Sequence, residues 1–327
     1  CAVGAVDVLL LDLSKVIRRD TGGRFNTVCF FDKSREYVIE TQKRIPGAIG
    51  FPGDFTSIVL AEHPDGSPLI LSDDGLRPPE TAADSRVVRE TQIRVEMRRN
   101  FVTHFPFDVI NLDLEEFLLK PRDPFPGKVI GALRQIFEWQ KKPLKKPDGT
   151  NGDSVSGFTL MFTTQLGPAN LTDEYLAMLR GYLQQNIERD PELLPLLRAR
   201  LGTDDLTKIE KEQFAEFFRL AMPKALASIA MEKDWYIDPE NGINFLEIER
   251  PSNDGPYKMI HLVMDVRRQN PPAHKRAPGV SAAGVVSTYT KVVRDLFTTR
   301  AISVNAVLDG TPSMKKSLQD NLDSVFS

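Results

Sequence analysis

The stretch that decides the fold is residues 25–55, FNTVCFFDKSREYVIETQKRIPGAIGFPGDF. Its first eight residues read as a buried strand that ends in Asp32. Residues 48–55 read as a second short strand that ends in Gly53 and Asp54. The segment between the strands has apolar residues at helical spacing and is predicted to be a helix. The order strand, acid, helix, strand, acid is typical of an open parallel sheet in an α/β protein.

The two acids predict a nucleoside site. The carboxyl ends of parallel strands face the crevice where ligands bind. There, Asp32 can accept hydrogen bonds from both hydroxyls of a ribose, and Asp54 can accept one from an adenine amino group. The alternative is a local role, in which each acid caps or turns the chain into the next helix. Asp32 precedes Lys33 and Ser34, and Asp54 precedes Phe55, so both interpretations stay open.

Composition places the chain among soluble globular proteins. It has 327 residues, of which 41% are hydrophobic and 27% charged, with a net charge of −3. That charge gives no whole-chain attraction to nucleic acid, although a local basic face is possible. Cys1 and Cys29 are the only cysteines, which excludes a disulfide framework or a four-cysteine zinc site. No apolar run reaches the ~20 residues of a membrane span, so we expect a cytoplasmic protein without a membrane partner.

The rest of the chain continues the alternation and then breaks it. A predicted helical insertion follows the strand GFTLMFTTQ, and two strands joined by PSNDGP then form an antiparallel hairpin. We therefore expect an α/β fold with a Rossmann-like, mostly parallel sheet, a C-terminal antiparallel hairpin and a helical insertion. The predicted parts are a core over 1–170, the insertion over 171–240, the closing hairpin over 241–270 and a helical extension over 271–327.

The beginning of the chain can be read in two ways. Residues 6–19 have helical spacing and are followed by Gly22 and Gly23, but VDVLLLDL alone also fits a strand. We prefer the helix, because a strand there would leave only about a dozen residues for the crossover to the next one, the lower limit. The first five residues would then be a turn after a strand that precedes Cys1.

The order of elements resembles the class I methyltransferase family, which binds S-adenosyl-L-methionine. In that family the last strand of a seven-stranded sheet is antiparallel and pairs through a hairpin. The resemblance covers roughly residues 1–268 and implies S-adenosylmethionine-dependent methyl transfer to an unknown acceptor.

The resemblance also implies the roles of individual residues. Cys1, Ala2 and Gly4 belong to the loop under the methionine part of the cofactor, Asp32 holds the ribose, and Gly53, Asp54 and Phe55 flank the adenine. Asn111 and Asp113, in the NLDL that closes a buried strand, lie beside the methyl group as the expected catalytic residues. We expect all these side chains to converge on one edge of the sheet.

Two other functions remain open. A nicotinamide-dependent oxidoreductase is disfavoured, because no G-x-G-x-x-G opens a helix and the closing hairpin fits methyltransferases better. A non-catalytic methyltransferase-like module is kept open by the single glycine of the first loop. Five arginines in residues 85–100 are mixed with glutamates and suggest a solvated, ion-paired face, with phosphate contact as the alternative. The four histidines show no metal-ligand spacing.

Overall fold

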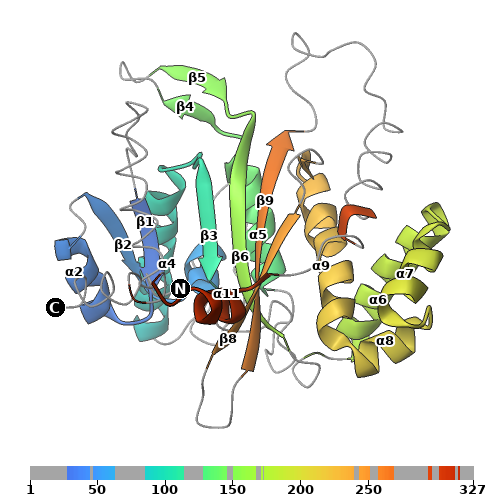
Figure 1. Ribbon diagram of the computed structural model, residues 1–327. Coiled ribbons are helices and arrows are strands. Elements are labelled where there is room, and N and C mark those ends of the chain that lie inside the picture. Colours follow the sequence, from blue (N-terminus) through green and yellow to red (C-terminus); the bar gives the residue numbers. More distant parts are fainter. Residues whose placement is uncertain are drawn as a thin grey trace. The chain divides into compact units, whose positions relative to one another are not determined.

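The computed structural model describes residues 28–44, 47–62, 85–113, 128–145, 150–166, 171, 173–238, 243–250, 257–268, 294–296, 302–313 and 316. The chain divides into two compact units, which are described separately. Unit 1 comprises residues 1–105 and 305–327, and unit 2 comprises residues 106–304. Both combine helices and strands, which confirms the expected α/β class (Figure 1).

Unit 1 contains the strand–helix–strand predicted from residues 25–55. Strands β1 (Val28–Asp32) and β2 (Ala48–Pro52) are parallel, with Asp32 opposite Pro52. Helix α2 (Arg35–Arg44) makes the crossover between them and packs on both. Gly50 lets this helix approach closely: a Cβ there would lie 2.4 Å from Cγ1 of Val38 and 2.7 Å from Cζ of Phe30.

An aromatic cluster forms the other side of unit 1. It joins the strands to helices α3 (Phe55–Val59) and α4 (Ser85–Val102). The ring of Phe31 contacts those of Phe51, Phe55 and Phe101 at centroid distances of 5.2, 5.4 and 4.8 Å. Two of these contacts are edge-to-face, a geometry that contributes about 0.5–1.5 kcal/mol per pair beyond area burial.

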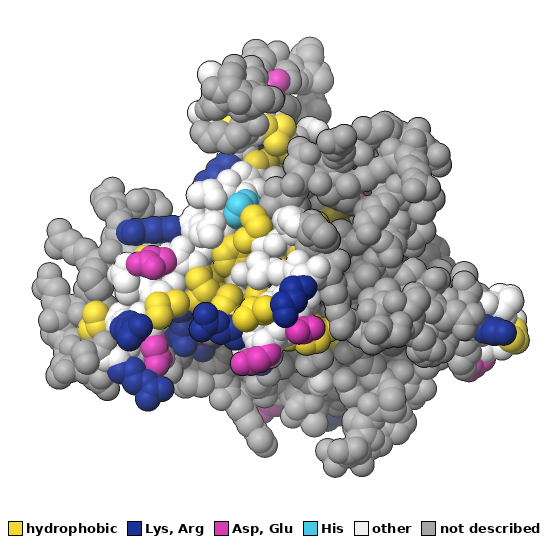
Figure 2. All heavy atoms as spheres, turned by 90° about the vertical axis from the view of Figure 1, so that its left-hand side faces the viewer, with side chains coloured by type: hydrophobic (Ala, Val, Ile, Leu, Met, Phe, Trp, Pro, Cys, Tyr) yellow, Lys and Arg dark blue, Asp and Glu magenta, His cyan; other side chains and the backbone are white. Residues whose placement is uncertain are grey.

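Two of the five arginines of α4 bind backbone carbonyls around the end of α3. Arg98 Nε donates to the carbonyl of Val59 at 2.9 Å, and Arg94 donates to that of Glu62 at 2.7 Å. These carbonyls lie at and just beyond the end of α3, where cations are favoured. Arg86 pairs with Glu90 at 2.9 Å, as expected for an ion-paired face. Figure 2 shows basic, acidic and hydrophobic side chains intermixed on the face turned to the viewer.

Unit 2 is built on a mixed six-stranded sheet. Its strands are β3 (Val109–Asp113), β6 (Gly157–Leu166), β7 (Trp235–Ile237), β8 (Ile243–Arg250), β9 (Tyr257–Arg268) and β10 (Ile302–Ser303). The order is β10-β8-β9-β6-β3, with β7 also on β9. The sheet expected to be mostly parallel is mixed, because β9 runs antiparallel to β6, β7 and β8. The expected sheet also included β1 and β2, which instead form a two-stranded sheet of their own. The pairs β3–β6 and β8–β10 are parallel.

The two faces of this sheet differ in polarity. One face carries apolar side chains such as Phe162 and Leu262, both 0% exposed. Helix α5 (Lys128–Trp139) packs on this face, where the rings of Phe137 and Phe158 lie 5.8 Å apart. Trp235, which is also fully buried, donates its indole N–H to the carbonyl of Phe137 at 2.8 Å. The opposite face, called the polar face below, carries Thr159, Thr163, His261 and Asp265 together with the apolar Met161 and Val263, most of them half-buried.

Four helices lie between β6 and β7, where the insertion was predicted. They are α6 (Asp173–Arg189), α7 (Leu193–Leu201), α8 (Leu206–Glu212) and α9 (Phe214–Met231). The helices are interrupted at Asp190 and at Gly202, which ends α7 in the left-handed conformation. A further break at Gln213 separates α8 from α9. Between residues 217 and 230 almost every side chain of α9 is buried, so α9 is the core of the insertion.

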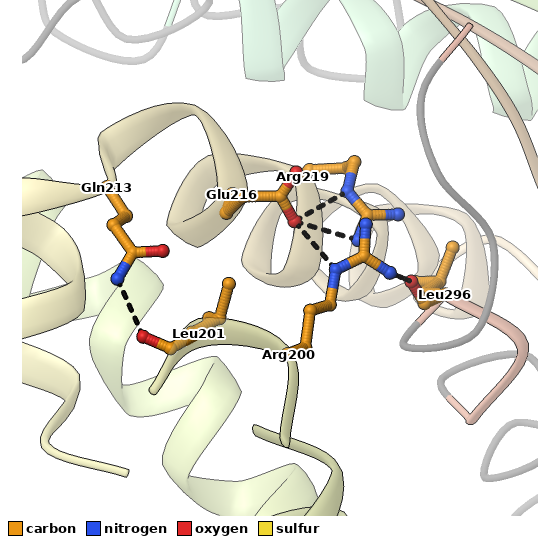
Figure 3. Close-up of polar contacts among 6 residues, drawn as sticks. All are labelled: Arg200, Leu201, Gln213, Glu216, Arg219 and Leu296. Carbon is orange, nitrogen blue, oxygen red and sulfur yellow. Dashed lines mark hydrogen bonds and ion pairs between the residues drawn. The ribbon is translucent and has the colours of Figure 1, made fainter. Parts of the chain in front are cut away.

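Ion pairs and hydrogen bonds connect residues 294–296 to the helices of the insertion, in part through the contacts drawn in Figure 3. Oε2 of Glu216 accepts from Nε of Arg200 at 3.1 Å and from Nη2 of the buried Arg219 at 3.0 Å. Arg200 also donates to the carbonyl of Leu296 at 3.3 Å. Arg294 donates to both carboxylate oxygens of Asp190. Residues 294–296 are thereby held against the helical insertion.

The structure also contains a short two-stranded sheet and a helix near the end of the chain. The short antiparallel strands β4 (Pro143–Lys145) and β5 (Asn151–Ser154) lie between α5 and β6. Helix α11 (Val304–Gly310) follows β10, and most of the predicted helical extension lies outside the described residues. None of the helices described here combines the length and apolarity needed to span a membrane.

The close approach at Gly50 gives a stability test. Gly50→Ala is expected to lower the free energy of unfolding by about 1–3 kcal/mol, because its Cβ would overlap Val38. Gly181→Ala in α6 is the control, since nothing lies within 4 Å of its added Cβ. That change is expected to stabilise by up to about 1 kcal/mol through helix propensity. Chemical denaturation measures both, and equal stability of the two variants would refute the packing.

Candidate functional site

Asp32 ends β1 and turns the chain toward α2. Its Oδ1 accepts a hydrogen bond from the backbone N–H of Ser34 at 2.7 Å. Its carbonyl accepts one from Gly53 N–H, also at 2.7 Å, which ties the ends of β1 and β2 together. The side chain is half-buried. Among the described residues, its second carboxylate oxygen accepts no hydrogen bond.

Asp54 lies at the same edge and caps α3. Its Oδ1 accepts from the backbone N–H groups of Thr56 and Ser57, at 3.0 and 3.4 Å, and from the Thr56 hydroxyl at 2.6 Å. Gly53 precedes it with φ of +142°, a conformation that other residues rarely adopt. The second oxygen of Asp54, like that of Asp32, accepts no hydrogen bond within the described part of the chain.

The structure therefore brings together the two acids singled out in the sequence. The local roles are confirmed for both, because each carboxylate supports the turn or helix that follows it. These roles use one oxygen of each acid. The other oxygen has the charge and lone pairs to accept from a hydroxyl or an amino group of a ligand. Ligand binding by Asp32 and Asp54 stays a prediction.

Phe55 has a clear structural role. It is 3% exposed, and its ring meets that of Phe31 nearly at right angles. The ring therefore has little surface left for an adenine, and the predicted contact remains to be tested. Cys1, Ala2 and Gly4 lie outside the described residues.

Asn111 and Asp113 lie on β3 in unit 2. Their Cα partners on β6 are Met161 and Thr163, and alternation places Asn111, Met161 and Thr163 on the sheet face opposite Phe162. Asn111 is half-buried, and Asp113 is the last residue of its strand. Because Asp32 and Asp54 belong to unit 1, the expected convergence of the four side chains stays a prediction.

The polar face adds residues that sequence reasoning did not select. Thr163 pairs with His261 across β6 and β9, and Thr163 Oγ1 lies 2.7 Å from His261 Nδ1. The register thus sets Asp113, Thr163 and His261 in one row across three strands. Four residues along each strand, Thr159 pairs with Asp265, and the Thr159 hydroxyl donates to the Asp265 carboxylate at 2.8 Å. In the sequence of β9, His261 and Asp265 are polar residues four positions apart within an otherwise apolar run from Met259 to Val266, and this is the signal that could have selected them.

Cys29, on β1, is poorly suited to act as a nucleophile. Burial raises the pKa of the Cys29 thiol to about 12. The thiol therefore stays protonated at neutral pH and is a poor nucleophile. In the part of the chain that the structure describes, no three His, Cys, Asp or Glu side chains are grouped to hold a metal ion.

Comparisons with models of protein families, with curated proteins and with solved structures found no match for this chain. The case for a function therefore depends on the residues and geometry given above.

Proposed function

We propose that this protein transfers a methyl group from S-adenosyl-L-methionine to an acceptor. The observation that carries the proposal is the place of β9 in the sheet. It is the second strand of the β8–β9 hairpin and runs antiparallel between β6 and β8, while β3 and β6 are parallel. A closing antiparallel strand paired through a hairpin is the feature by which the sequence resembles class I methyltransferases. In unit 1, β1 and β2 form a separate two-stranded parallel sheet with a helical crossover, the repeating unit of Rossmann-like folds.

The carboxyl edge of β1 and β2 fits a nucleoside. Asp32 and Asp54 lie on adjacent strand ends, joined by the bond from Gly53 N–H to the Asp32 carbonyl. Each keeps one carboxylate oxygen without a partner among the described residues. In this proposal Asp32 accepts from the ribose hydroxyls and Asp54 from the adenine amino group. The positive φ of Gly53 shapes the turn between them.

The chemistry required of the protein is mainly positioning. Bound S-adenosylmethionine supplies an electrophilic methyl group on a sulfonium sulfur. Asn111 and Asp113 are proposed to orient the acceptor, and positioning together with a matched electrostatic environment can provide most of the rate acceleration. Where the acceptor carries a proton that must leave, Asp113 is the proposed base.

Isothermal titration calorimetry tests the function directly. S-adenosylhomocysteine is expected to bind the full-length protein with a stoichiometry of about one, while NAD is expected not to bind. Binding of NAD alone would support the oxidoreductase alternative. If neither ligand binds, the methyl-transfer proposal is wrong and a non-catalytic module becomes the better account.

Asp32→Ala is expected to weaken S-adenosylhomocysteine binding by at least about tenfold, because a charge-assisted hydrogen bond contributes about 1.5–3 kcal/mol. Asp32→Asn is the matched variant, since its amide oxygen still accepts from Ser34 N–H but carries no charge. It is expected to keep the stability of the wild type and to bind with intermediate affinity. Unchanged affinity in the alanine variant would show that Asp32 acts only in the turn.

A second pair of variants separates capping from binding at Asp54. Asp205 caps α8 in the same way, since its Oδ1 accepts from the N–H groups of Thr207 and Lys208. Asp54→Ala and Asp205→Ala are each expected to cost about 0.5–2 kcal/mol of stability. Only Asp54→Ala is expected to weaken S-adenosylhomocysteine binding. If both variants bind S-adenosylhomocysteine with equal affinity, Asp54 is not part of the binding site.

The catalytic assignment gives a kinetic prediction. Asn111→Ala and Asp113→Ala are expected to lower kcat for the true acceptor far more than they change the affinity for S-adenosylhomocysteine. The reason is that their contacts are proposed to form in the transition state. Gln165→Ala, at a half-buried position on the same face of β6, is the control for general disturbance of this surface. Wild-type turnover in both alanine variants would show that Asn111 and Asp113 have only a structural role at the end of β3.

A further inference from the structure

The helical insertion contains a buried cation without a protein partner. Lys224, in the middle of α9, is 5% exposed. Within the part of the chain that the structure describes, its Nζ makes no hydrogen bond. Burial, with a smaller contribution from the nearby charge of Arg189, lowers the pKa of this amine to about 8, while Glu188 opposes the shift. At pH 7 the amine is still mostly protonated, so a positive charge is held in a low-dielectric interior.

A second unsatisfied donor lies on the helix that packs against α9. Asn186 in α6 is 5% exposed, and its Nδ2 has no hydrogen-bond partner among the described residues. It belongs to the buried side of α6 together with Leu183 and Ile187, and α6 packs on α9. Asn186 and Arg189 are three residues apart and therefore neighbours on the surface of α6. The two charges that act on Lys224, those of Glu188 and Arg189, thus lie two and three residues beyond Asn186 on the same helix.

These groups are donors that lack an acceptor. The neighbouring carboxylate of Glu188 lies on an exposed residue and accepts from Gln184 Nε2 at 3.2 Å. A trapped water can accept hydrogen bonds from buried donors, but it neutralises no charge. An anion does both, and charge-assisted bonds are the stronger ones.

We propose that a small oxyanion of the carboxylate or phosphate class binds between α6 and α9, held by Lys224 and Asn186. Arg189 adds positive potential at the rim of this site. The site belongs to the helical insertion and is independent of the proposed methyl transfer. It gives the insertion a ligand of its own, whose binding stabilises the packing of α6 on α9.

Calorimetric titration of the full-length protein tests this site, with inorganic phosphate and acetate as separate probes at pH 7 and constant ionic strength. Saturable binding of at least one probe is expected. Lys224→Met is expected to weaken it by roughly tenfold to a hundredfold, the loss of one charge-assisted bond. Lys211→Met, at an exposed lysine of α8, is the control and is expected to bind as the wild type does.

Two further measurements make the result decisive. Asn186→Leu keeps the charge of Lys224 and is expected to weaken binding less than Lys224→Met. Acetate affinity is expected to fall as pH rises from 7 to 9, because the amine loses its proton in that range. Absence of saturable binding by either probe, or equal affinity in the wild type and Lys224→Met, would overturn the proposal. Preference for phosphate or for acetate identifies the chemical class of the natural ligand.

Discussion

The antiparallel strand β9 is the constraint on which unit 2 depends. Strands β7 and β8 both pair with β9, and β9 in turn pairs with β6 along almost its whole length. Its inward side chains are at most 1% exposed, and burial of each contributes roughly 1.5–3 kcal/mol. The same alternation sends His261 and Asp265 to the opposite face. One strand therefore fixes both the apolar core under α5 and the polar face beside Asn111.

The edge of unit 1 shows why a structural and a binding role do not exclude each other. A carboxylate has two oxygens, and the turn after β1 and the cap of α3 each use one of them. The bond from Gly53 N–H to the Asp32 carbonyl holds the two strand ends together. The acids are thus fixed before any ligand arrives, so binding a nucleoside would cost little side-chain entropy.

The elements with strong periodicity could be predicted from the sequence, while those defined by long-range pairing could not. The hairpin strands β8 and β9 and the helix–strand pattern of unit 1 follow from apolar spacing and turn residues. Strand β7 has three residues, too few for a period, and exists because it pairs with β9. The contact between Thr163 and His261 joins positions 98 residues apart, so it required the register of the sheet. For Asp32 the sequence could not distinguish a turn-forming role from a ligand-binding role. Both roles require an acidic residue at the end of the first strand.

The central claim is that the carboxyl edge of β1 and β2 binds the adenosyl group. Hydrogen–deuterium exchange with and without saturating S-adenosylhomocysteine tests it most directly. The account predicts slower exchange in residues 28–36 and 50–58, where a bound nucleoside would restrain Asp32 and Asp54, and no effect of NAD. Unchanged exchange in both segments at saturation, or protection confined to other parts of the chain, would contradict it.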